Sequence, residues 1–181
     1  REKFHLPNLD THVDAGSNVA VSVAEYFNTM LDRTMDWRAA EKIRDEWGGT
    51  FCLKGIMSVA DARRAVSMGA DAIMVSNHGG RQLDGSRSPF DQIAEIADAV
   101  GGEIEIICDG GVRRGTHVLK AIASGANACS GGRLYLYALA AAGQPGVERI
   151  LGKLRDEIER DMRLMGVASI DELGRDQLRR R

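Results

Sequence analysis

From residue 37 onward, the sequence alternates between helical patterns and short apolar strands, and this alternation limits the fold more than any other feature. Trp37, Ala40, Ile43 and Trp47 recur at helical spacing, and a short apolar strand follows them at once. The same order then repeats along the chain. The predicted helices cover residues 37–47, 58–69, 88–100, 116–125, 134–141 and 144–166, and the predicted strands cover 50–55, 71–75 and 103–111, with a fourth strand after Gly125.

Helix-capping residues support two of these boundaries. Ser58 and Asp61 occupy the two positions of a capping box. Ser88 is an expected N-cap, with Pro89 at the first helical position and Asp91 three residues after the cap. The sequence therefore predicts that helices begin directly after Ser58 and Ser88.

Apolar strands that are separated by helices indicate parallel strands, buried on both faces of a sheet. Four such units in a row make half of a TIM (β/α)₈ barrel. An open doubly wound sheet shows the same alternation, so periodicity alone does not choose between these two α/β folds. The choice depends on the chemistry of the loops.

Composition excludes several classes of function. The 181 residues are 44% hydrophobic and 28% charged, which is typical of one globular domain with a sizeable core. A formal net charge of −2 gives no attraction to nucleic acid. No apolar run approaches the ~18 residues of a membrane span, and no signal-peptide pattern is present. Cys52, Cys108 and Cys129 lie in apolar stretches without metal-ligand spacing, which predicts buried thiols in the cytosol and no metal site.

Chemically active residues gather where each predicted strand ends. In parallel α/β folds, functional groups collect beyond the carboxyl ends of the strands. No strand start carries comparable residues, and this one-sidedness predicts a functional site at one edge of the sheet. In chain order the ends carry Lys54 with Gly55, residues 76–81 (SNHGGR), residues 109–113 (DGGVR) and residues 131–133 (GGR).

The last two of these loops have the composition of a phosphate site. Glycines let backbone N–H groups approach a ligand, and the arginine fork matches phosphate oxygens. The two loops together are similar to the phosphate site that barrel enzymes build after their last two strands, with residues 134–141 as the short extra helix. One such loop alone would be interpreted as a glycine turn with a solvated arginine, whereas two adjacent loops favour phosphate binding.

The loop after the second strand combines a base with a carboxylate clamp. His78 has the side chain that most often acts as a general base near neutral pH, and Arg81 can hold a carboxylate through two hydrogen bonds. Lys54 is either a surface lysine or a fixed charge that stabilises an anion. Asp109 either binds sugar-like hydroxyls or caps its glycine turn. His5, His12 and His117 receive no role, and Tyr135 and Tyr137 are assigned to packing of the short helix.

Four stretches in this order resemble one known family, the FMN-dependent α-hydroxy acid dehydrogenases and oxidases of the L-lactate dehydrogenase, glycolate oxidase and mandelate dehydrogenase group. The stretches are LKGI, SNHGGRQLD, DGGVRRGTHVLKA and GGRLYLYALAAAGQPGVERIL, and the resemblance runs from about Trp37 to Leu173. It corresponds to the C-terminal half of the family. The resemblance implies a TIM barrel that holds FMN and oxidises an L-2-hydroxy acid to the 2-oxo acid.

The resemblance also implies a role for each residue at the strand ends. His78 would take a proton from the substrate, and Arg81 would bind the substrate carboxylate. Lys54 would favour the anionic reduced flavin, Ser76 would hydrogen-bond the flavin, and Asp109 would bind the ribityl chain. Val112 is also an implied cofactor-binding residue, and the implied phosphate ligands are Gly110, Gly111, Arg113, Gly132 and Arg133.

Two positions depart from the family pattern, Gly131 and Leu134, which flank the intact pair of Gly132 and Arg133. In the family, strands one to four precede the polar stretch that opens this sequence. The N-terminal half of the same barrel is therefore an expected partner, and the 181-residue chain is expected to be inactive by itself. The expected regions are a loop from the preceding half at 1–36, the C-terminal half of an FMN-binding barrel at 37–173 and a charged tail at 174–181.

The resemblance leaves substrate, electron acceptor and assembly open. L-Lactate is the expected substrate because nothing in the sequence suggests an aromatic pocket, and oxygen, a quinone or a cytochrome could each reoxidise the flavin. Family members often form tetramers, so the resemblance implies a homo-oligomer. The expected location is the cytoplasm, with a peripheral position at the inner membrane face as the alternative.

Two alternative functions remain from the sequence. Another FMN-binding or phosphate-binding TIM barrel would share the phosphate loops but would not need the pair of His78 and Arg81. A non-catalytic half-barrel would only bind a phosphate ligand or a partner chain. A dinucleotide site is disfavoured, because no GxGxxG follows a strand.

Overall fold

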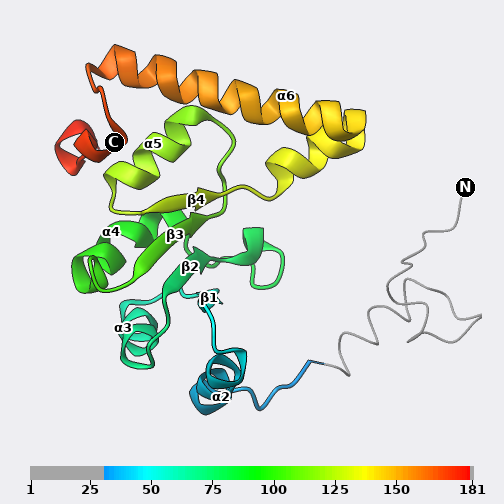
Figure 1. The fold of residues 1–181 in the computed structure, drawn as a ribbon, viewed down its shortest axis with the longest axis vertical. Coiled ribbons are helices and arrows are strands. Elements are labelled where there is room, and N and C mark those ends of the chain that lie inside the picture. Colours follow the sequence, from blue (N-terminus) through cyan, green and yellow to red (C-terminus); the bar gives the residue numbers. More distant parts are fainter. Residues whose placement is uncertain (1–30, 180–181) are drawn as a thin grey trace, which may run out of the picture. The chain divides into compact units, whose positions relative to one another are not determined.

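A computed structural model describes residues 31–179, and these residues contain a four-stranded parallel sheet with helices packed against it (Figure 1). The strands follow one another across the sheet in chain order, β1-β2-β3-β4. Parallel pairing sets Lys54 opposite Met74, and Ser76 opposite Asp109. The strands are β1 (Cys52–Lys54), β2 (Ala72–Ser76), β3 (Glu105–Asp109) and β4 (Ala128–Ser130).

The helices lie where the periodicity predicts them. They are α2 (Trp37–Trp47), α3 (Val59–Ser67), α4 (Pro89–Val100), α5 (Gly115–Ala123) and α6 (Arg133–Met165), with short 3₁₀ turns η2 (His78–Gly80), η3 (Ile170–Glu172) and η4 (Arg175–Gln177). Both predicted caps are confirmed, because the Ser58 and Ser88 side chains accept the N–H groups of Asp61 and Asp91. Among the described helices, none is long and apolar enough to cross a membrane.

The chain divides between Glu46 and Trp47 into two units. Almost all of α2 belongs to the first unit. Only Ala40 is buried in this helix, whereas Ile43 and Trp47 are 44% and 67% exposed. The sheet, the other helices and the site described below all belong to the second unit.

Strand order decides between the two folds that the periodicity leaves open. In an open doubly wound sheet the strand order reverses at a switch point, so that helices cover both faces. Here every new strand is added at the same edge, as in a barrel. The second unit therefore has the architecture of about four β/α units of a (β/α)₈ barrel.

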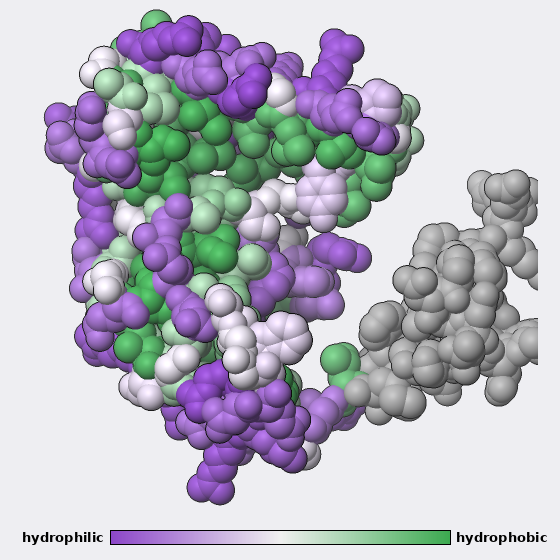
Figure 2. All heavy atoms as spheres, viewed as in Figure 1, coloured by the Kyte–Doolittle hydropathy of each residue, from purple (hydrophilic) through white to green (hydrophobic). Residues whose placement is uncertain are grey.

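Burial differs between the two faces of the sheet. Ile73, Val75, Ile106 and Cys108 point to the helix-covered face and are at most 1% exposed. Side chains that alternate with them along the strands, such as Ile107, are more exposed. The predicted burial on both faces is confirmed for Ala72 and Ser76 of β2, which are buried, and is wrong for Met74 and Ile107, because the packed helices cover one face only. In Figure 2, apolar residues are visible along α6 and over the neighbouring strands.

The exposure of the three cysteines also depends on their position in the sheet. Cys108 is buried and Cys129 is partly buried, and loss of hydration raises the pKa of these thiols to about 12 and about 11. Cys52 is exposed, so its predicted burial is wrong. Its strand, β1, lies at an edge of the sheet. An edge strand has a neighbour on one side only, and a run of apolar letters does not reveal that position.

Helix α6 consists of two helical segments joined by a break. The backbone leaves helical geometry at Ala142 and Gly143, and Gly143 has a φ of +58°. Pro145 follows within the first turn of the second segment, where its missing N–H costs no helical hydrogen bond. The break separates the short and long helices that the sequence predicts at 134–141 and 144–166.

Candidate active site

The loops that follow the strands surround one cavity of about 430 Å³, which we call the site cavity. This volume lies in the range of roughly 300–1,000 Å³ that is usual for small-molecule and cofactor sites. Every residue that the sequence predicts for the site lines this cavity, with the exception of Ser76. Ser76 is connected to it through a hydrogen bond to the lining residue Asp109. The carboxyl ends of the four strands therefore bring the predicted residues together.

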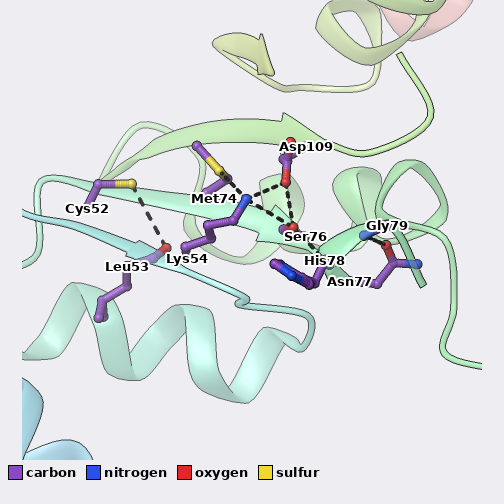
Figure 3. Close-up of polar contacts among 9 residues, drawn as sticks. All are labelled: Cys52, Leu53, Lys54, Met74, Ser76, Asn77, His78, Gly79 and Asp109. Atoms are coloured by element: carbon purple, nitrogen blue, oxygen red, sulfur yellow. Dashed lines mark hydrogen bonds and ion pairs between the residues drawn. The ribbon is translucent and has the colours of Figure 1, made fainter. Parts of the chain in front are cut away.

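Three neighbouring strands contribute one polar cluster, made of Lys54, Ser76 and Asp109 (Figure 3). The Lys54 Nζ lies 2.5 Å from Asp109 Oδ2, and the Ser76 hydroxyl donates to the same oxygen at 2.6 Å. The Asp109 side chain is only 13% exposed. Burial by itself would raise the pKa of Asp109, but hydrogen bonds from Lys54, Ser76 and Ser130 and the charge of Lys54 lower it overall. The ionised carboxylate therefore holds the lysine ammonium at this edge of the sheet.

His78 has a left-handed backbone conformation beside this cluster. Its φ of +56° is the only positive value at a non-glycine residue in the described chain, and such geometry costs about 1–3 kcal/mol. The Ser76 hydroxyl accepts the His78 N–H at 3.1 Å, and Asn77 Oδ1 accepts the Gly79 N–H at 3.0 Å. Figure 3 shows His78 next to Ser76 and the polar cluster. Hydrogen bonds to the loop backbone, rather than core packing, thus fix the backbone from which the exposed imidazole extends.

Arg133 connects the loop after β4 with the loop that carries His78. Its Nη2 donates to the Gly79 carbonyl at 3.0 Å. A Cβ on Gly79 would lie 2.9 Å from this nitrogen, so glycine is what allows the close approach. Arg81 lines the same cavity from the His78 loop. His78, Arg81 and Arg133 therefore share one cavity.

The geometry of the two glycine loops is compatible with a bound phosphate. A Cβ on Gly111 or Gly132 would meet no atom within 4 Å, so the backbone at both positions faces open space. Gly111 also has a φ of +73°, which favours glycine. Arg113 and Arg133 line the cavity from these two loops, and α5 begins at Gly115, directly after the first of them. Open backbone and two guanidinium groups form a suitable anion cradle.

Several residues that line the site cavity were not assigned to it from the sequence, among them Ser130, Tyr135, Leu136 and Tyr137. The predicted packing role of Tyr135 and Tyr137 is wrong, because both line the cavity and are 43% and 69% exposed. Ser130 lies opposite Asp109 in the sheet, on the same face. Strand alternation, counted back from the Gly132 loop, is the signal that could have identified Ser130.

The two departures from the family pattern pack against each other. A Cβ on Gly131 would lie 3.5 Å from Leu134 Cδ2, so the Leu134 side chain occupies the space beside this glycine. Both residues line the site cavity. His5 and His12, which have no predicted role, lie outside the described residues. Among residues 31–179, no group of three metal-ligating side chains comes together.

Comparison with known proteins identifies the family. The family model described as FMN-dependent dehydrogenase matches residues 3–180. An L-lactate dehydrogenase from Alcaligenes faecalis is 49% identical over 148 residues, which are 82% of this chain and 39% of the relative. The chain therefore belongs to the FMN-dependent dehydrogenase family, as the sequence motifs predict.

Solved structures give the same result. The flavin-binding domain of baker's yeast flavocytochrome b2 matches with a TM-score of 0.79 and 41% identity, over 81% of this chain and 39% of that chain. A mandelate oxidase that carries an FMN adduct matches with a TM-score of 0.74 and 46% identity, over 78% of this chain and 45% of that chain. The chain thus spans less than half the length of these relatives, which agrees with the four β/α units of the second unit.

Proposed function

We propose that this chain belongs to an enzyme that uses FMN to oxidise a small L-2-hydroxy acid, L-lactate foremost, to the 2-oxo acid. The observation that carries the proposal is that His78 and Arg81 line the same cavity as the two phosphate-type loops and Lys54. The similarity to the Alcaligenes faecalis L-lactate dehydrogenase supports L-lactate as the substrate.

The residues of the site cavity are suited to FMN. Gly111, Arg113, Gly132 and Arg133 would hold the phosphate, because they combine open backbone with two guanidinium groups. The carboxylate of Asp109 would accept hydrogen bonds from the ribityl hydroxyls. When bound, FMN supplies a flavin ring that accepts the two electrons of the oxidation.

His78 and Arg81 would act on the substrate. The Arg81 guanidinium binds the carboxylate through two parallel hydrogen bonds and so orients the hydroxyl-bearing carbon. Conversion of that carbon to a carbonyl removes two electrons and two protons from the substrate; the His78 imidazole would accept one proton, and the other would pass with the electron pair to the bound flavin. The strained backbone at His78 fixes the starting point of this side chain.

Lys54 would stabilise negative charge that develops during the oxidation. The Lys54 side chain is 49% exposed, but its ammonium pairs with the Asp109 carboxylate, which is only 13% exposed and fixes the position of the charge. Because Asp109 neutralises part of this charge, the pair as a whole determines the field at the site. Replacement of either partner would change that field.

The test uses the full natural chain. We expect a yellow protein whose flavin absorption is bleached by L-lactate in the absence of oxygen. His78→Gln should retain the flavin spectrum and lower the bleaching rate by about 10²–10⁴-fold, because the base is removed. Arg81→Lys, which keeps the charge but loses the fork, should mainly raise the substrate concentration needed for half-maximal bleaching.

Two results would contradict the proposal. A colourless protein that does not take up FMN would show that FMN is not its cofactor. A yellow protein that no 2-hydroxy acid bleaches would leave only a flavin-binding barrel of another function.

A further inference from the structure

His117, which has no role in the site described above, contacts the phosphate-type loop but does not line the site cavity. It is the third residue of α5, and its side chain reaches back along the chain. Its Nδ1 lies 3.2 Å from the Arg113 nitrogen and 3.1 Å from the Gly111 carbonyl oxygen. The imidazole therefore contacts both ends of the turn formed by residues 111–113.

This turn borders two cavities, which also share the lining residues Gly79, Gly110 and Arg133. One is the site cavity, and the other is a second cavity of about 440 Å³ that His117 and Lys120 help to line. Gly111 and Val112 line both cavities. Gly111 has no side chain and Arg113 is exposed, so Val112 is the one side chain of the turn that is buried. A turn with so little packing needs another contact to keep its shape.

The hydrogen bond from Arg113 determines which atoms the turn can offer a ligand. In the tautomer that carries the ring proton on Nε2, Nδ1 accepts the Arg113 N–H through its lone pair; in the other tautomer, Nδ1–H would donate to the Gly111 carbonyl instead. This bond occupies the Arg113 N–H and fixes the backbone from which its guanidinium extends. The Arg113 side chain, which lines the site cavity, thus extends from a fixed backbone position.

Ordinary helix capping does not account for this contact. In a capping box, the side chain of the third helical residue bonds the N–H of the N-cap, which here is Arg114. The His117 side chain bonds the residue before the N-cap. Its effect is therefore on the glycine turn rather than on the helix end.

We propose that His117 is a positioning residue for the phosphate of the cofactor, and that it acts by bracing the turn of residues 111–113. This inference rests on the proposed function, because it assumes that FMN occupies the site cavity. On this proposal, His117 strengthens binding of the phosphate end of the cofactor and does not affect binding of the flavin ring.

The test compares the affinities of the deflavinated full chain for FMN and for riboflavin, which lacks the phosphate, by titration of flavin absorbance. His117→Gln keeps a side chain suited to a capping box but moves the acceptor away from Arg113. We expect it to weaken FMN binding about tenfold, the usual size for one lost hydrogen bond, and to leave riboflavin binding unchanged. His117→Asn should restore FMN binding, because Asn Oδ1 can occupy the position of Nδ1.

The two proposals fail in different ways. Equal weakening of FMN and riboflavin binding by His117→Gln, or no weakening of either, would overturn the bracing role while the FMN site stands. Failure of His117→Asn to restore binding would also overturn it. If the unmodified chain bound neither flavin, the proposed function would fail first, and the role of His117 with it.

Discussion

Gly79 and Gly80 form a matched pair of neighbouring glycines in the His78 loop. Their φ values are +70° and +69°, so an L side chain is strained to the same degree at both. They differ in their surroundings. A Cβ on Gly79 would lie 2.9 Å from Arg133 Nη2, whereas a Cβ on Gly80 would meet nothing within 4 Å.

This difference predicts distinct effects of two single substitutions. Gly79→Ala and Gly80→Ala should each lower the free energy of unfolding by about 1–2 kcal/mol, the cost of left-handed backbone at a residue with a Cβ. Gly79→Ala should in addition weaken FMN binding, because the new methyl group displaces the Arg133 guanidinium. Urea unfolding and flavin titration of the full chain measure the two effects. Equal loss of FMN affinity in both variants would show that the contact with Arg133 has no importance for binding.

At the scale of elements, the start of α5 depends on its contact with α6. Gly115, the first residue of α5, is buried. The carboxylate of Glu157, on α6, accepts the Gly115 N–H at 2.9 Å and pairs with Arg114. These two hydrogen bonds, that of Gly115 foremost, lower the pKa of Glu157. Because the phosphate-type loop leads directly into α5, this contact also fixes the end of that loop.

Two glycines of these helices allow a controlled test of this contact. A Cβ on Gly115 would lie 2.6 Å from the Ile158 backbone nitrogen, so Gly115→Ala should destabilise the protein by about 1–3 kcal/mol through overpacking. Gly152, in the middle of α6, has nothing within 4 Å of such an atom. Gly152→Ala should therefore stabilise the protein by up to about 1 kcal/mol, through helix propensity alone. Thermal unfolding of the full-chain variants gives both values, and a neutral Gly115→Ala would contradict the close packing.

At the scale of the whole molecule, the sheet of the second unit has two kinds of uncovered surface. Strands β1 and β4 are its edges, and each has a row of unpaired backbone groups. The face opposite the helices carries partly exposed apolar side chains such as Met74 and Ile107. The relatives are more than twice as long as the matched region, and in a closed barrel further strands would cover these surfaces.

We therefore expect the 181-residue chain, purified by itself, to self-associate and to show no FMN-dependent oxidation of L-lactate. Light scattering after size-exclusion chromatography measures the association, and anaerobic flavin bleaching measures the activity. The full natural chain serves as the control for both. A monodisperse 181-residue monomer that oxidises L-lactate would contradict this prediction.

Much of this protein was readable from its sequence because the responsible interactions are local. Helical and strand periodicity, the Ser58 and Ser88 caps and the glycine break in α6 each depend on residues within a few positions of one another. The placement of functional residues after strands was also predictable, since parallel strands must all end at the same edge. For this reason the residues expected at the site share one cavity.

Other features were decided only by the tertiary structure. The pairing of Lys54 with Asp109 joins residues 55 positions apart, and it depends on the register of three strands. The exposure of Cys52 and of the tyrosines of α6 depends on which neighbours cover them, and a hydropathy pattern does not contain that information. His117 likewise gains its contact from the fold of a glycine turn. The sequence by itself determined the elements and the chemistry at their ends, whereas long-range contacts decided which groups pair there, because pairing follows from distances in space rather than along the chain.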